Sequence, residues 1–75
     1  MKGTRQLTGV IEREGDGYVS LCPELDIASQ GESIDEARRN LVEAVELFFE
    51  TAADSEIKDR FSSEVYITRI EVNVG

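Results

Sequence analysis

The only cysteine, Cys22, is the first candidate for chemistry, because a thiolate is a strong nucleophile. The chain contains no histidine, so the Ser–His and Cys–His pairs that activate a nucleophile are excluded. Acidic Glu24 and Asp26 lie close in sequence and would raise the pKa of the thiol, and no basic residue adjoins it. We therefore expect Cys22 to be a half-buried strand residue without a catalytic role.

Carboxylates are the second candidate, because several of them together can hold Mg²⁺ through oxygen ligands. Asp16 belongs to a predicted turn, however, and Asp35 and Glu36 complement the positive end of a predicted helix. Neither an EF-hand loop nor a G-x-x-x-x-G-K-[ST] phosphate loop is present. The sequence predicts no catalytic residue, no metal site, no cofactor and no enzymatic activity. The acids considered for a metal site are Glu12, Asp16, Glu24, Asp26, Asp35 and Glu36.

The net charge of −8 indicates instead a protein that binds another protein. This charge would repel nucleic acid and anionic membrane surfaces and attract a basic protein. In the predicted helix, Arg38 and Arg39 precede three acids, an order that opposes the helix dipole by ~0.3–1 kcal/mol per charge. The acids form either an ordinary solvated face or a strip for a cationic protein. The candidate partner-binding residues are Glu43, Glu46, Glu50, Glu24 and Asp26.

Size and composition predict the localisation, the number of domains and the oligomeric state of the protein. The N-terminal residues lack the apolar stretch of a secretory signal, and no run approaches the ~20 apolar residues that span a bilayer. We expect a cytoplasmic protein that does not contact the membrane. The 75 residues predict one domain, 1–75, with a marginal hydrophobic core. Because an internal disulfide is excluded and histidine ligands are absent, we expect a homo-oligomer, a dimer or tetramer.

The candidate residues up to Gly31 lie on three predicted strands and on the turns between them. Residues 4–14 are rich in β-branched side chains, and Asp16-Gly17 is typical of a tight turn. Residues 18–22 alternate, so that Val19 and Leu21 face one way and Tyr18, Ser20 and Cys22 the other. Pro23 should end this strand, and residues 25–31 predict a third strand that stops near Gly31.

An amphipathic helix follows, because apolar residues recur at steps of three and four. Ser33 is the expected N-cap, and Glu36 three residues later completes a capping box. The apolar positions are Ile34, Ala37, Leu41, Ala44 or Val45, Phe48 and Ala52.

Residues 51–63 are polar and predict a loop with one turn around residues 57–61. Residues 64–74 predict a last strand, with Val65 and Ile67 on one face and Ile70, Val72 and Val74 on the other. Such a change of face indicates a β-bulge or a strand that is apolar on both sides, in a central or subunit-bridging position.

These elements predict an α+β fold of the order β-β-β-α-β. Three strands form an antiparallel meander, and a right-handed crossover returns the last strand parallel to the first. The expected strand order is 3-2-1-4, with one main helix on one face of the sheet. The other face is left open, which is a further reason to expect an oligomer.

Residues 9–50 contain a string of short motifs. They are Asp16-Gly17-Tyr18, Cys22-Pro23-Glu24-Leu25, Ser29-Gln30-Gly31, Ser33 to Ala37 and Asn40 to Leu47. In this combination they resemble the N-terminal domain of the HicB-like antitoxin family. The family pattern has an aromatic strand after a D-G turn, then C/F-P-[DE]-L, a short strand, S/T-x-G, a helix that begins S/T-x-x-E-A, and N-[LI]-x-E-A-[IVL]-E-L. The residues to which the resemblance gives a structural role are Asp16, Gly17, Tyr18, Cys22, Pro23, Gly31, Ser33, Glu36 and Ala37.

The resemblance implies a partial, degenerate RNase H-like fold and a type II toxin–antitoxin system. HicB-like proteins bind HicA toxins, small basic ribonucleases that cleave mRNA, and mask their catalytic histidine. Many also repress their own operon through a C-terminal helix-turn-helix or ribbon-helix-helix module. The residues after Glu50 fit neither module, so the chain resembles a short member that does not bind nucleic acid directly.

Three hypotheses about function follow. The first is a non-catalytic HicB-like antitoxin that binds and masks a basic HicA-like ribonuclease. The second is a stand-alone, self-associating regulatory domain without a toxin. The third, a residual metal-dependent nuclease, ranks last because a clustered set of catalytic acids is not evident in the sequence.

Overall fold

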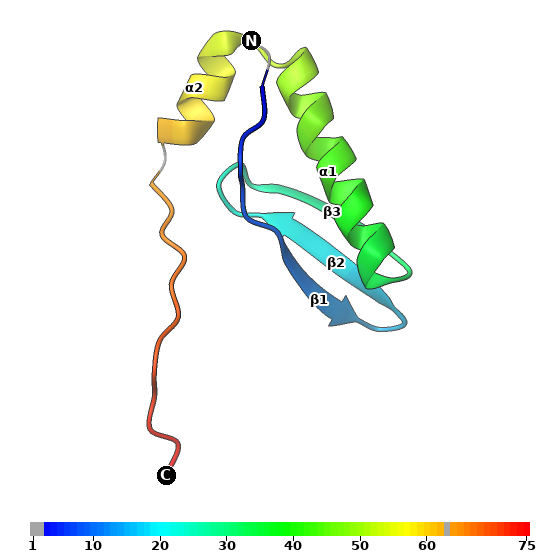
Figure 1. Ribbon diagram of the computed structural model, residues 1–75, viewed down its shortest axis with the longest axis vertical. Coiled ribbons are helices and arrows are strands. Elements are labelled where there is room, and N and C mark those ends of the chain that lie inside the picture. Colours follow the sequence, from blue (N-terminus) through cyan, green and yellow to red (C-terminus); the bar gives the residue numbers. More distant parts are fainter. Residues whose placement is uncertain (1–2, 63) are drawn as a thin grey trace.

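The computed structural model of the protein describes residues 3–62 and 64–75. The elements follow in the order β1 (Val10–Glu14), β2 (Gly17–Cys22), β3 (Ile27–Gly31), α1 (Ile34–Thr51) and α2 (Asp54–Ser62). The strands form one antiparallel sheet of order β1-β2-β3, and α1 packs mainly against β3 and β2 (Figure 1). The predicted meander is confirmed.

The turn between β1 and β2 consists of Gly15 and Asp16, because Glu14 pairs with Gly17 across it. Gly15 has a φ of 61°, which glycine adopts readily, and a glycine at the first central position is typical of a type II′ hairpin turn. The predicted turn at Asp16-Gly17 is therefore displaced by one residue, and Gly17 begins β2. The first strand also starts later than predicted, at Val10.

The register gives the sheet one covered and one open face. Ser20 points toward α1 and is buried, and its hydroxyl donates a hydrogen bond to the carbonyl oxygen of Ala37 over 2.9 Å. Val10, Leu21 and Ala28 are paired across the three strands and share the opposite face, where all three are exposed. The expected open face of the sheet is present.

The core lies between the sheet, α1 and the turn that joins β2 to β3. Leu25 in that turn is 1% exposed and packs with Cys22 and Leu41. Six partly buried side chains surround this centre, three of them aromatic. They are Leu7, Ile27, Val45, Phe48, Phe49 and Phe61.

The junction of β3 and α1 is close and well capped. The Ser33 hydroxyl accepts a hydrogen bond from the amide of Glu36 over 3.1 Å, which confirms Ser33 as the N-cap. The Glu36 carboxylate accepts from the amide of Glu32, one residue before the donor of a capping box. A Cβ added at Gly31 would lie 2.5 Å from the amide nitrogen of Ala37, so only glycine fits this approach without displacement.

The second helix replaces most of the loop predicted for residues 51–63. Nine residues form α2. The Phe61 ring stacks on Phe49 at a centroid distance of 6.1 Å, and the Arg60 guanidinium donates to the carbonyl of Leu25. These contacts hold α2 against the end of α1 and the β2–β3 turn. Ser63, the last residue of the predicted loop, lies outside the described residues.

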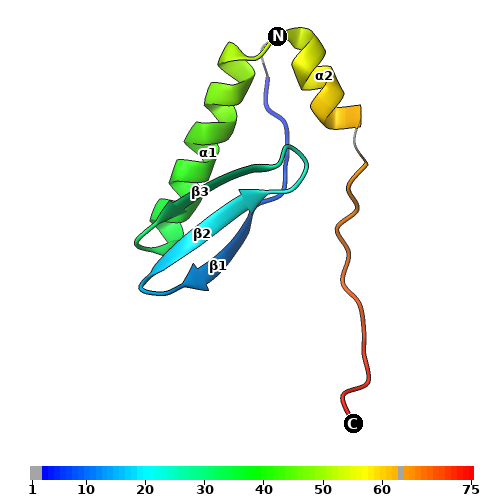
Figure 2. The ribbon, with the colours of Figure 1, turned by 180° about the vertical axis from the view of Figure 1, so that it is seen from behind.

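The predicted fourth strand is wrong for residues 64–75, which are extended but pair with no strand. The order 3-2-1-4 and the partial RNase H-like β-β-β-α-β fold are therefore wrong for the described part of the chain. The segment leaves α2 and runs apart from the sheet in both views (Figures 1 and 2). The radius of gyration is consequently 14.5 Å, against ~11 Å for a compact chain of this length.

In the described part of the chain, no helix has both the length and the apolar character needed to cross a bilayer.

Candidate interaction surface

The C-terminal half of α1 presents an acidic face to solvent. Glu43, Glu46 and Glu50 are all exposed, and their spacing of three and four residues brings them to one side of the helix. The core lies on the other side of α1, so these carboxylates remain free to meet another molecule. The structure thus brings together three of the five predicted partner-binding residues.

Two apolar side chains flank these acids and were missed from the sequence. Val42 is 45% exposed and lies one turn before Glu46, whereas Leu47 is 58% exposed and lies one turn after Glu43. Both are apolar, but neither lies at the three- and four-residue spacing of the core positions. This departure from the core spacing is the sequence signal that could have identified them as exposed apolar residues. We call Val42, Glu43, Glu46, Leu47 and Glu50 together the α1 outer face. Protein interfaces combine an apolar centre with a polar rim, and the α1 outer face offers both kinds of side chain.

Glu24 lies elsewhere and already has partners within the chain. Its carboxylate accepts hydrogen bonds from the amide of Thr8 over 2.9 Å and from the Thr8 hydroxyl over 2.7 Å. Burial raises the pKa of the Glu24 carboxyl, but hydrogen bonds from Thr8, from its own backbone amide and from Cys22 together outweigh burial and lower the pKa below its ordinary value. Glu24 therefore ties the segment before β1 to the β2–β3 turn.

Asp26, the fifth predicted residue, is exposed in the same turn at a φ of 56°, a left-handed conformation that aspartate tolerates. Cys22 is 1% exposed, more deeply buried than the half-buried residue expected. Burial raises the pKa of its thiol, and the nearby Glu24 carboxylate adds to this. The neutral thiol donates a hydrogen bond of 3.6 Å to that carboxylate.

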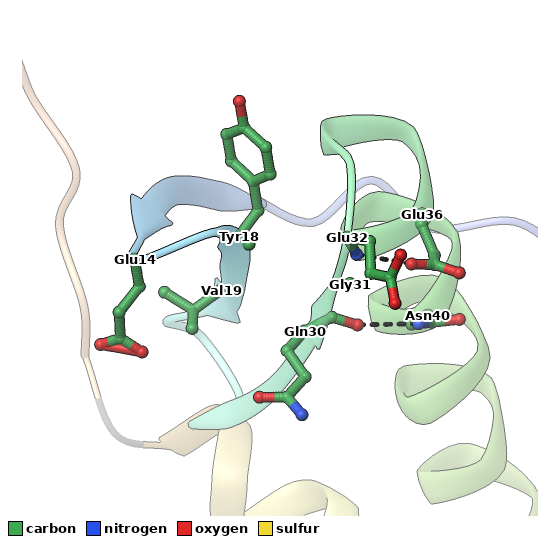
Figure 3. Close-up of a pocket in the computed structure, with 9 residues that line it drawn as sticks. Glu14, Tyr18, Val19, Gln30, Gly31, Glu32, Glu36 and Asn40 are labelled. Carbon is green, nitrogen blue, oxygen red and sulfur yellow. Dashed lines mark hydrogen bonds between the residues drawn. The ribbon is translucent and has the colours of Figure 1, made fainter.

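A shallow pocket of about 450 Å³ lies where β2, β3 and the start of α1 meet (Figure 3). Two of its polar side chains form hydrogen bonds within the chain. The Asn40 amide donates to the carbonyl of Gln30 over 2.7 Å, and Glu36 accepts from the amide of Glu32. Tyr18 and Glu14 point in opposite directions, so they do not converge on a common point. This arrangement joins α1 to the sheet.

The acids considered for a metal site are dispersed over the molecule. Glu12 lies in β1, Asp16 in the hairpin turn, and Asp35 and Glu36 in the first turn of α1. Among residues 3–62 and 64–75, no group of three or more cysteine, aspartate or glutamate side chains is placed to hold a metal ion.

The chain was compared with protein-family models, curated proteins and solved structures, and none of them matches it.

Proposed function

We propose that this protein is a non-catalytic, HicB-like antitoxin module that acts in the cytoplasm by covering a basic protein surface with the α1 outer face. The partner is a HicA-like ribonuclease, and binding masks its active site. The observation that carries the proposal is the cluster of three exposed carboxylates around two exposed apolar side chains on one helix.

The chemistry of the α1 outer face supports a protein as the partner. The carboxylates attract a cationic surface and orient it, which mainly accelerates association. Val42 and Leu47 supply apolar area whose burial slows dissociation. The net charge of −8 acts in the same direction as the local charges.

The test is copurification with a small basic HicA-like ribonuclease encoded beside the gene, followed by an assay of mRNA cleavage. The wild-type chain should bind the ribonuclease and suppress cleavage. Changing Glu43, Glu46 and Glu50 together to Gln should weaken binding by roughly tenfold or more, mostly through slower association that depends on salt. Changing Leu47 to Ala should accelerate dissociation.

A matched control removes three exposed carboxylates elsewhere. The triple variant with Glu12, Glu14 and Glu56 changed to Gln has the same net charge but an unchanged α1 outer face. It should bind the ribonuclease nearly as tightly as the wild type. If both triple variants lose binding equally, only net charge matters and the assignment of the surface is wrong.

Self-association is a second proposed function, and a separate observation favours it. Residues 64–74 carry apolar side chains that the described chain leaves exposed, with Ile70 78% and Val74 94% exposed. Sedimentation over a range of concentrations tests this function, and a monomer at every concentration would exclude it.

A further inference from the structure

Residues 64–75 form an extended segment without a sheet, and we call them the C-terminal segment. Its large apolar side chains are exposed, and its backbone N–H and C=O groups pair with no strand. A strand in this state is a ready template for pairing with another chain. The question is which chain fits it.

The charges of the segment are complementary to themselves. Arg69 and Glu71 flank Ile70, and a two-fold contact requires that each residue meet its complement on an identical copy. If two segments run antiparallel about Ile70, Arg69 of each copy lies opposite Glu71 of the other. We propose that two copies of this protein pair through their C-terminal segments in this register, as an antiparallel two-stranded ribbon.

The same register gives the ribbon an apolar face. Side chains directly opposite one another in an antiparallel pair lie on the same side. Tyr66 then lies opposite Val74, and Ile70 opposite its own copy, so that one side carries aromatic and β-branched pairs. The residues on this side are Tyr66, Thr68, Ile70, Val72 and Val74.

Neighbouring registers are less favourable because they oppose like charges. Moving the centre to Arg69 places two arginines opposite one another, and moving it to Glu71 does the same with two glutamates. Like charges in directly opposite positions destabilise a strand pair. A shift by an odd number of residues in the pairing would place the apolar face of one segment beside the polar face of the other. The charges therefore select the register centred on Ile70.

The charge of the C-terminal segment opposes contact between two copies only weakly. Glu64, Arg69 and Glu71 give it a net charge of −1, out of −8 for the whole chain. A two-stranded ribbon is marginal by itself. Exposed apolar side chains on the open face of the sheet, Val10 and Leu21, offer a surface on which the ribbon can pack.

This inference rests on the second proposed function, self-association, and a cysteine scan tests its register. Replacing Ile70 with Cys places two thiols at directly opposite positions, where the Cα distance of ~4.5–5.5 Å permits a disulfide. I70C should form a covalent dimer on mild oxidation. T68C is the matched control, because its two copies would lie ~14 Å apart along the ribbon. Cys22 is buried, so the wild type should not cross-link.

Charge reversal supplies a test that does not involve cysteine. R69E and E71R should each weaken self-association by roughly tenfold or more, because both turn two attractive pairs into two repulsive ones. An equimolar mixture of R69E and E71R should associate, since every opposing pair between the two variants is then of opposite sign. The substituted side chains are exposed, so at a concentration at which the wild type is monomeric the thermal melt of each variant should match that of the wild type.

The outcomes separate this inference from the function on which it rests. A wild-type monomer at all concentrations excludes both. A dimer that tolerates R69E and E71R, or that cross-links through T68C and not through I70C, retains self-association but overturns the proposed pairing. Cross-linking through I70C alone, together with recovery of association in the mixture, supports it.

Discussion

Replacing Gly31 with alanine should destabilise the fold more than its one added methyl group suggests. The new Cβ would lie 2.5 Å from the amide nitrogen of Ala37 and 2.8 Å from the carbonyl carbon of Glu36. Both are backbone atoms of the first turns of α1, so no side-chain rotation relieves the contact. The helix must move away from β3 instead.

The cost follows from what this movement disturbs. Overpacking in a close contact costs ~1–3 kcal/mol. Displacement of α1 also weakens the buried hydrogen bond from Ser20 to the Ala37 carbonyl, which adds about 1 kcal/mol. Alanine recovers ~0.4–1 kcal/mol by restricting the unfolded chain. The net loss is about 2 kcal/mol at the centre of a range of ~1–3.6 kcal/mol. This is a large part of the ~4–11 kcal/mol expected for a chain of this length.

Urea and thermal unfolding followed by circular dichroism measure this loss, at one fixed protein concentration. The midpoint temperature of G31A should fall by ~8 °C or more, since ~1 kcal/mol corresponds to ~4–8 °C in a domain of this size. G9A is the matched control, because its added Cβ would only reach van der Waals contact with Leu41, at 3.5 Å. Equal midpoints for G31A and G9A would refute the reasoning.

Three further predictions concern groups around the core. S20A should lower the unfolding free energy by ~1–3 kcal/mol, because the Ala37 carbonyl would lose its hydroxyl donor, and urea titration measures this. Cys22 should react with iodoacetamide much more slowly in the folded chain than in 6 M urea, since it is buried and its thiol pKa is raised; equal rates would contradict the burial. Folding lowers the pKa of Glu24 below its ordinary value of 4.5, so its carboxylate should stabilise the protein above pH 4.5. This stabilisation should be lost as the pH falls through the lower pKa of the folded state. The difference in unfolding free energy between wild type and E24Q should therefore shrink between pH 7 and pH 3, and a constant difference would exclude the charge as its cause.

The sheet and α1 could be predicted because their signals are local. Alternation sets the faces of β2, and the sequence from Gly31 to Glu36 marks both the end of a strand and the start of a helix. The helix α2 could not be recognised in the same way. Its apolar positions Ile57 and Phe61 make one weak pair, and Phe61 finds its partner in Phe49, on another helix. Tertiary contacts, more than local propensity, stabilise this element.

The C-terminal segment shows a different limit of sequence reasoning. Its composition predicts an extended conformation, which the structure has, but composition does not specify the strand with which it pairs. The candidate partner-binding residues show the same difference between local and long-range signals. Glu43, Glu46 and Glu50 follow from helical spacing, whereas the bond between Glu24 and Thr8 joins residues sixteen positions apart.

The two proposed surfaces consist of different residues. Charge repulsion between copies nevertheless couples partner binding to self-association. The α1 outer face and the C-terminal segment share no side chain, so one copy can engage a basic partner and a second copy at the same time. Each chain carries a net charge of −8, and this repulsion opposes self-association at long range. A basic partner on the α1 outer face would reduce the repulsion and strengthen pairing of the segments. Because such coupling is reciprocal, self-association must then strengthen partner binding by the same factor.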